Sequence, residues 1–358
     1  MKKSLLALAA MGAFAGAAQA QSSVTVYGVL DKAYSSMEQK VTASSGATTS
    51  TTTTTTGGSG NGGGGTAASQ NYTTERIGFR GTEDLGGGLT ASFTLEMRIG
   101  TLDSADSGTE ADGLPVRQSN ISIASKQFGS ITVGRQTSLM ENAFGAGNSS
   151  NQNNFIGTLY YSGQKFNNSR SDRLVTYASP TFNGFAVAAQ IGRRDVKTTT
   201  VTGQDEMALS LSYAQGPLTV NVTHLREETK AADVVTAKPE ATVAGANYNF
   251  GPVAGFVTYA QGKNNLTSVA NDRSAWEVGA RAPVTKAVTL QASTYRGTDQ
   301  VTAAATKSDV SGYQFSALYN FSKRTNLYAV IGADETKNDA GGTKTQRSTY
   351  GVGARHTF

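Results

Sequence analysis

The sequence of 358 residues contains no cysteine, only six prolines and two histidines. The lack of cysteine argues against a disulfide-stapled secreted fold. A histidine general base would have to be His224 or His356, and neither a GxSxG nor an HExxH pattern occurs. We therefore predict that the protein is not an enzyme and holds no cofactor or metal, although a carboxylate pair assembled by the fold stays an alternative.

Long apolar runs are also lacking, apart from one at the N-terminus. Lys2 and Lys3 precede the run LLALAAMGAFAGAA, and the AQA at Ala18 to Ala20 fits a cleavage site. We predict that residues 1–20 are a signal peptide. Beyond them no stretch reaches the roughly 20 apolar residues of a spanning helix, so a chain that enters a membrane must cross it as strands.

Charge of one sign is not concentrated anywhere. The chain carries 31 Lys and Arg against 26 Asp and Glu, a formal net charge of +5, and these residues are scattered. This pattern argues against a nucleic-acid partner. With 38% apolar residues and 41 glycines, the chain is polar and glycine-rich, which indicates that its apolar residues are confined to one face.

What the sequence does contain is a regular succession of turns. Seven short Gly-, Pro- or Ser-containing reversals, such as EDLGGGL at Glu83 and NFSKRTN at Asn320, alternate with eight longer polar segments. This makes fifteen connections and predicts sixteen antiparallel strands. Each hairpin has one short and one long end, as hairpins of transmembrane β-barrels have; a soluble sandwich would alternate in the same way.

The strands themselves alternate in polarity. GLTASFTLEMRIG places Phe93 and Leu95 on one side and Glu96 on the other. Because backbone groups in lipid must all be paired, the sheet must close, and we expect the terminal TYGVGARHTF to pair with SVTVYGVLDKAY. Aromatic residues near strand ends would form an interfacial girdle: Tyr27, Phe128, Phe182, Phe250, Tyr319, Phe321 and Phe358.

Residues 41–72 are of low complexity, with tracts of Thr and Gly. Such tracts bury little surface and stay mobile, so we predict an extracellular first loop. It is either a variable exposed target or a repeat tract under little constraint. GNGGGG is not a phosphate loop, because no Lys-Ser/Thr follows it at the start of a helix.

Several motifs together resemble the general porins of Gram-negative beta-proteobacteria: SVTVYGVLD, ERIGFRGTEDLGGGLTASFTLE, FGSITVGRQ, LVTYASPTFNGFAVAAQ, YNFSKRTNLYA and VGARHTF. The resemblance covers nearly all of residues 21–358. It implies an all-β, sixteen-stranded antiparallel transmembrane barrel in the bacterial outer membrane. Short turns would face the periplasm and long loops the exterior, with residues 138–169 (loop 3) folded inward as the constriction. It also implies a homotrimer in contact with outer-membrane lipid and lipopolysaccharide.

The resemblance further implies a channel for passive diffusion, with a transverse field at its narrowest point. Matching the family's motifs assigns the basic side to Arg76, Arg117 and Arg170, with Arg173 as a competing alignment, and the acidic side to Glu96 and Glu141. Phe358 matches the terminal Phe that the outer-membrane insertion machinery reads.

Arg117 shares the parity of Ile121 and Ile123, so it faces lipid unless a bulge re-aims it. Loop 3 carries one acid, Glu141, against Lys165. The narrowest region should therefore be net positive, and we predict weak anion selectivity for small anionic or neutral hydrophilic solutes. Any single arginine could also be a plain solvated wall residue.

Two other readings stay open. A surface protein that uses the barrel only as an anchor would need a plug, and no segment looks large enough. A substrate-specific channel would need an aromatic track along the bore, for which Tyr160 and Tyr161 are the only hint.

Overall fold

The computed structural model describes residues 23–56, 74–99, 116–148, 159, 170–194, 203–231, 234–264, 271–301, 306–339 and 341–358. The predicted signal peptide and most of loop 3 lie outside these residues. Within the described part of the chain, no helix is long and apolar enough to cross a membrane.

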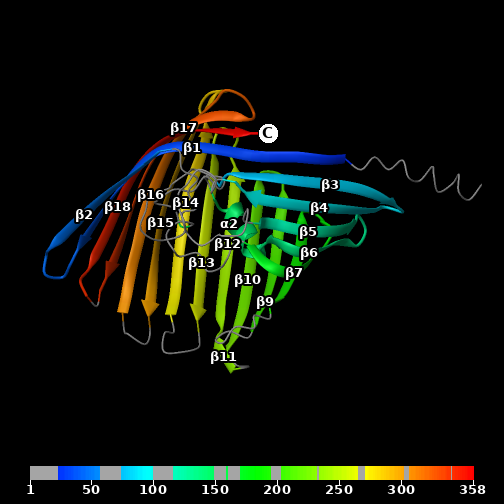
Figure 1. The fold of residues 1–358 in the computed structure, drawn as a ribbon, viewed down its shortest axis with the longest axis horizontal. Helices are drawn as coiled ribbons and strands as arrows, with labels where there is room; N and C mark the ends of the chain where they lie inside the picture. Colours follow the sequence, from blue (N-terminus) through cyan, green and yellow to red (C-terminus); the bar gives the residue numbers. More distant parts are fainter. Residues whose placement is uncertain are drawn as a thin grey trace, which may run out of the picture.

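Strands make up nearly all of the described chain (Figure 1). They are β1 (Ser23–Thr42), β2 (Thr48–Thr56), β3 (Arg76–Gly86), β4 (Leu89–Arg98), β5 (Val116–Ser125), β6 (Gly129–Thr137), β7 (Arg170–Ala178), β8 (Phe185–Arg194), β9 (Gly203–Gln215), β10 (Leu218–Ala231), β11 (Val234–Ala237), β12 (Pro239–Asn249), β13 (Ala254–Asn264), β14 (Asn271–Pro283), β15 (Val288–Val301), β16 (Thr306–Asn320), β17 (Thr325–Asn338) and β18 (Lys344–Thr357). The helix α2 (Leu139–Ala146) begins loop 3.

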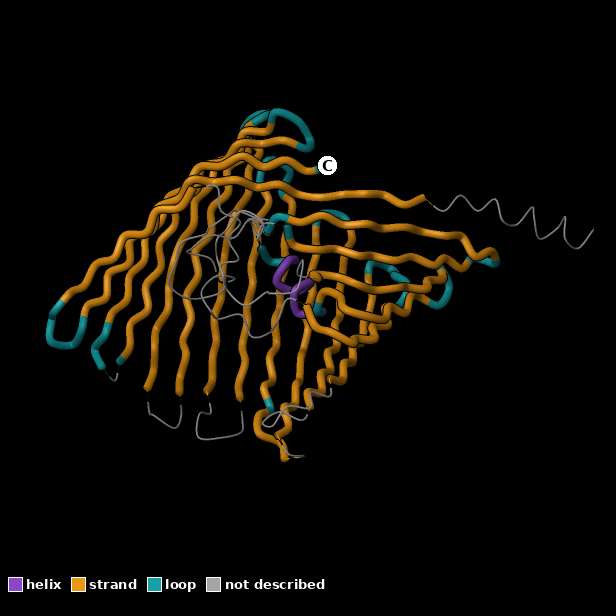
Figure 2. The backbone as a smooth tube through the Cα atoms, viewed as in Figure 1, coloured by secondary structure: helices purple, strands orange, loops and turns teal. Residues whose placement is uncertain are grey.

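The strands form one closed antiparallel sheet. Strand β1 pairs with β18 from Val29↔Thr357 to Thr42↔Lys344, so the last strand meets the first as predicted. Two of the eighteen strands, β2 and β11, pair with the outer ends of β1 and β10. The remaining sixteen make the barrel wall, which confirms the predicted fold (Figure 2).

Apolar side chains point outward along the wall. On β9, Met207, Leu209 and Leu211 are each about half exposed, whereas Ala208 and Ser210 between them are buried. The same alternation runs along the other strands because successive side chains point to opposite faces of a sheet. The exposed apolar band is what a lipid-facing surface requires.

The inner face also holds an apolar cluster that sequence periodicity does not reveal. Leu139, Met140, Ala143 and Phe144 of α2 and Leu159 pack against the inner face of the wall. The wall residues of this cluster are Ala208, Leu225, Ala241, Val243, Ala260, Ala275, Tyr295 and Val310. The amphipathic helix thus buries its apolar side on the wall rather than in a separate core.

The predicted first loop differs in part from the structure. Thr48–Thr56 form β2, which pairs with Tyr34–Thr42 of β1, and β3 pairs with Ser23–Val29 further along the same edge. The threonine tract can do this because β-branched residues favour strands once a partner edge is available. Residues 57–72 lie outside the described residues.

The described pairings on this edge of β1 end at Val29 with β3 and begin again at Tyr34 with β2. The carboxylate of Glu75 lies beside the stretch between them. It accepts the Asp31 backbone N–H at 2.9 Å and lies 3.0 Å from the ammonium of Lys32. Glu75 is 1% exposed, so its carboxylate is a buried acceptor for the backbone of β1.

The aromatic girdle is present at the short-turn ends. Phe128, Phe182, Phe250 and Phe321 are each more than 60% exposed near such turns. Tyr27 is an exception to the prediction, because its hydroxyl donates to Glu96 on the inner face.

Candidate functional site

Glu96 on β4 is the centre of a charged cluster on the inner face. The alternation of β4 turns Leu95 outward and Glu96 inward, where Glu96 is 5% exposed. Its Oε1 lies 2.6 Å from Nε of Arg117, and its Oε2 lies 3.7 Å from Nε of Arg76. The Tyr27 hydroxyl donates to the same Oε2 at 3.1 Å. Four neighbouring strands, β1, β3, β4 and β5, thus converge on one carboxylate.

Arg117 reaches this cluster through a bulge. The register of β4 and β5 shifts between Glu96 and Met97, which pair with Gln118 and Val116 and leave Arg117 as the extra residue. The bulge that the parity argument requires is therefore present, and Arg117 is 8% exposed beside Glu96. A lipid-facing arginine at mid-membrane would cost about 2–4 kcal/mol, which the bulge avoids.

Arg170 begins β7 opposite Thr137 and interacts electrostatically with Glu96. Arg173 is exposed and has a φ of 56°, within an irregular stretch where the register of β6 and β7 shifts. No contact between Arg173 and Glu96 is found among the described residues. Of the two competing alignments, Arg170 therefore lies with the other arginines.

Arg355 on β18, which was not predicted from the sequence, interacts electrostatically with Arg76. Its parity, opposite to that of Phe358, could have identified it as an inward residue. We call Arg76, Arg117, Arg170 and Arg355 around Glu96 the arginine cluster. It carries four permanent positive charges, since guanidinium groups stay protonated in proteins. Two inward carboxylates lie among the described residues beside them, Glu96 and Asp31, which is the cross-strand neighbour of Arg355.

Loop 3 begins inside the barrel, as far as it is described. Ser138 caps α2 by accepting the Glu141 N–H at 3.4 Å, and Glu141 is 7% exposed. Loop 3 leaves the wall at β6, yet its helix contacts β9, β10, β12 and β13. Lys165, Tyr160 and Tyr161 lie outside the described residues.

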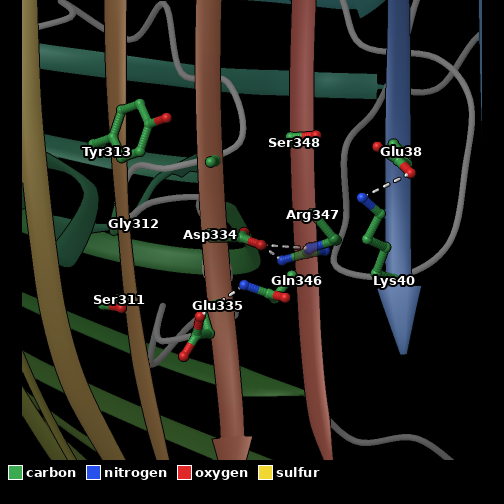
Figure 3. A pocket seen from close by; sticks show the side chains of 11 residues that line it. Glu38, Lys40, Ser311, Gly312, Tyr313, Asp334, Glu335, Gln346, Arg347 and Ser348 are labelled. Atoms are coloured by element: carbon green, nitrogen blue, oxygen red, sulfur yellow. Dashed lines mark hydrogen bonds and ion pairs between the residues drawn. The ribbon is translucent and has the colours of Figure 1, made fainter. Parts of the chain in front are cut away.

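Carboxylates and a second ion pair occupy other parts of the inner face. Glu277 on β14 is 3% exposed, and Glu206 and Glu227 face each other across β9 and β10. Arg347 on β18 forms a bidentate pair with Asp334 on β17, with N–O distances of 2.8 and 2.6 Å (Figure 3). No group of three or more metal-ligating side chains is found among the described residues.

Phe358 closes the barrel at the short-turn end. Its backbone N–H donates to Gly28 O at 3.1 Å, and its carbonyl accepts the Gly28 N–H at 3.0 Å. The ring covers Gly28, where a Cβ would collide with it. The terminal residue is thus held by backbone and side chain together.

Comparison with known proteins agrees with this architecture. The Gram-negative porin family matches residues 7–339. Outer membrane porin protein 32 of Delftia acidovorans is 31% identical, and an outer membrane porin protein of Bordetella pertussis is 29% identical; each alignment covers all of both chains. Among solved structures, an anion-selective porin from Comamonas acidovorans has a TM-score of 0.65 at 23% identity, over 94% of this chain and 100% of that one.

An outer membrane protein of Vibrio cholerae, OmpT with one loop deleted, has a TM-score of 0.68 at 17% identity, over 94% of this chain and 99% of that chain. These likenesses show the fold, and the family match covers most of the sequence. The sixteen-stranded barrel, its outward apolar band and its charged inner face are those of an outer-membrane channel, and the chain belongs to the Gram-negative porin family.

Proposed function

We propose that the pore is narrowest between the arginine cluster and loop 3 and passes anions in preference to cations. The observation that carries this proposal is the arginine cluster itself, with Arg76, Arg117 and Arg170 beside Glu96. Two unit charges 4 Å apart interact by about 4 kcal/mol at an effective dielectric constant of 20, so an excess of positive charge in a narrow bore favours anions. Anion selectivity is also named for the Comamonas porin.

The permeating solutes are small anionic or neutral hydrophilic molecules that cross by diffusion. Arginines from separate strands offer a passing anion a series of contacts. No single contact surrounds the anion, so it is not held in place. Glu141 contributes the acid of loop 3 to the transverse field, and Arg173 stands outside the narrowest region.

The test is the anion-to-cation permeability ratio of variants in planar bilayers. Arg76→Ala and Arg170→Ala should each lower the ratio, and the double variant should lower it further. The matched control is Arg193→Ala, because Arg193 is an exposed arginine on the outer face of β8. Unchanged permeability ratios in both cluster variants would show that the arginine cluster does not determine the ion selectivity.

The channel assembles as a homotrimer in this proposal. Lys32 shares its outward parity with Leu30 and Tyr34, and a lysine facing lipid costs about 2–4 kcal/mol at mid-membrane. A second copy docked on this face would cover Lys32 and its ion pair with Glu75. One solved structure with this fold, at 15% identity and a TM-score of 0.65, is of a trimer form of OmpT from Vibrio cholerae.

The long-loop ends of β1 and β16–β18 face the outer leaflet and its lipopolysaccharide. A groove of about 370 Å³ lies there, lined by Glu38, Lys40, Glu335 and Gln346 among others (Figure 3). Ion pairs of 3.2 Å (Lys40–Glu38) and 2.9 Å (Lys344–Glu335) place both charge signs in and beside this groove. Side chains of both charge signs suit a lipopolysaccharide head group, because the lysines can contact its phosphates and the carboxylates its bound cations.

Residues 1–20 direct export, and Phe358 is the signal for the insertion machinery. This role of Phe358 is supported by its position at the seam, where the last strand pairs with the first through the backbone bonds of Phe358 and Gly28. Its exposed fraction of 41% leaves the ring accessible on the outer face.

A further inference from the structure

Two inward tyrosines of the wall each lie across a glycine of the neighbouring strand. Tyr27 of β1 is directly opposite Gly78 of β3. Tyr328 of β17 is directly opposite Gly353 of β18. A Cβ on Gly78 would lie 2.6 Å from the Tyr27 hydroxyl oxygen, and a Cβ on Gly353 would collide with the ring of Tyr328. Neither glycine has a positive φ, so the close approach of the ring, and not the backbone conformation, requires a residue without a side chain.

Each of these rings ends at an acid beside the arginine cluster. The Tyr27 hydroxyl crosses β3 and donates to Glu96 Oε2 on β4 at 3.1 Å. The Tyr328 hydroxyl crosses β18 and donates to Asp31 Oδ1 on β1 at 2.6 Å. Two separate sets of three neighbouring strands thus carry the same arrangement of tyrosine, glycine and carboxylate. Hydrogen bonds to an ionised oxygen are stronger than those between neutral groups, so each hydroxyl holds its acid firmly.

The two acids lie deeper in the wall than the arginines beside them. The side chain of Glu96 is 6% exposed, against 22% for Arg76. Asp31 is 0% exposed, whereas its cross-strand neighbour Arg355 is partly exposed. A solute in the bore therefore approaches the guanidinium groups more closely than the carboxylates. Because Coulomb energy falls with distance, this arrangement gives the positive charges the larger effect on a passing ion.

The barrel contains a third ring over a glycine, and it lacks the bond to an acid. Tyr295 of β15 is directly opposite Gly312 of β16, which in turn is opposite Asp334 of β17. No hydrogen bond from the Tyr295 hydroxyl to Asp334 is found among the described residues, and Arg347 holds that carboxylate by two bonds instead. Packing of a ring on a glycine therefore does not by itself bring a hydroxyl to a carboxylate.

We propose that Tyr27 and Tyr328 are positioning residues that hold Glu96 and Asp31 against the wall and so determine the ion selectivity of the bore. The inference rests on the proposed anion preference. Without the Tyr27 hydroxyl, Oε2 of Glu96 keeps only the longer contact with Arg76, at 3.7 Å. The carboxylate is then free to turn toward the bore, where it attracts cations and offsets the arginines.

The experiment measures the anion-to-cation permeability ratio of the full chain in planar bilayers under a KCl gradient. Tyr27→Phe and Tyr328→Phe keep the ring over its glycine and remove only the donor. Each should lower the ratio by up to about fivefold, the factor that one unit charge 4 Å from an ion gives in bulk water (about 1 kcal/mol). The double variant should lower the ratio further, because it releases two different acids.

Tyr295→Phe is the matched control, since it removes a hydroxyl from a ring in the same setting and should leave the ratio unchanged. Adding Glu96→Gln to Tyr27→Phe removes the released charge and should restore the ratio at least to that of the unaltered protein. Gly78→Ala pushes the ring of Tyr27 off the wall and should lower the ratio as Tyr27→Phe does. The slower, heat-sensitive migration of folded barrels in gels shows which variants fold; if Gly78→Ala does not, the tyrosine variants still decide.

A purely structural role of the two tyrosines would lower the heat resistance of the folded band and leave the permeability ratio unchanged. That result in both Tyr27→Phe and Tyr328→Phe would overturn the proposal, as would a loss that Glu96→Gln does not reverse. Failure of the anion-selectivity proposal would instead appear as a potassium-signed reversal potential in the unaltered protein. The shift of the tyrosine variants relative to that protein is measured in either case.

Discussion

At the scale of single residues, the charged cluster depends on one extra amino acid. Strict alternation would turn Arg117 to lipid beside Ile121, and the bulge at Glu96 turns it inward. The sequence already shows that Arg117 shares the parity of outward residues. Whether a bulge turns it inward depends on how β5 pairs with its partner strand. The contact that does so, Arg117 to Glu96, joins residues 21 positions apart.

Arg117→Ala should destabilise the barrel. It leaves Glu96 buried with the longer Arg76 contact, the Tyr27 hydroxyl and the more distant charge of Arg170. Breaking a buried pair from one side costs about 3–5 kcal/mol. The measurement is urea unfolding of the protein in detergent. Arg135→Ala is the control, because its pair with Asp172 is exposed and such pairs are worth about 0–1 kcal/mol. Equal losses of unfolding free energy in the two variants would show that the Arg117–Glu96 pair stabilises the barrel no more than an exposed pair does.

Arg355→Ala should lower the anion preference of the channel. Arg355 faces the same region as Arg76 and adds to its positive potential. The reversal potential in a KCl gradient measures this change. Arg324→Ala on the β16–β17 turn removes the same charge outside the bore and should leave the potential unchanged. Equal shifts in both variants would assign the effect to net charge alone.

At the scale of elements, the strands were predictable and the inner arrangement was not. Alternation and turn chemistry are local, so the number of wall strands and the closing seam could be derived from the sequence. The position of α2 and the bond of Leu159 to Glu277 join residues up to 118 positions apart and leave no periodic signal. Tyr27 was misplaced for a similar reason, since its partner Glu96 lies on another strand.

The threonine tract shows the opposite limitation. Its composition predicts a loop, yet the part at Thr48–Thr56 is strand because the extended end of β1 offers it an edge. Intrinsic strand preference becomes visible only when a partner is present.

Gly28→Val should impair closure of the barrel. A side chain at Gly28 would collide with the ring of Phe358 and approach the Arg76 carbonyl, and the backbone of a strand cannot yield to it cheaply. The folded band in unheated gels should decrease strongly. Gly145→Ala is the control, because nothing lies within 4 Å of its added Cβ. A normal folded fraction of Gly28→Val would contradict the seam described for Phe358.

At the scale of the whole molecule, the barrel sorts apolar and charged side chains onto opposite faces. The outward band suits lipid over most of the wall, and near β1 it is interrupted by Lys32 and its ion pair with Glu75. This interruption is the physical reason to place the proposed contact between subunits there.

Lys32→Glu should weaken the trimer. It sets two carboxylates against each other at Glu75 on the proposed contact face. The temperature at which the oligomer band disappears in gels should fall. Lys263→Glu reverses a charge on the outer face of β13 and should leave that temperature unchanged. Equal melting of the two variants would exclude this face as the contact.

The most direct test of the account is the reversal potential of the unaltered protein in a planar bilayer under a KCl gradient. Four arginines against the carboxylates of Glu96 and Asp31 at the proposed constriction predict a potential of the sign set by chloride. A potential of the sign set by potassium would contradict the placement of the arginine cluster at the constriction.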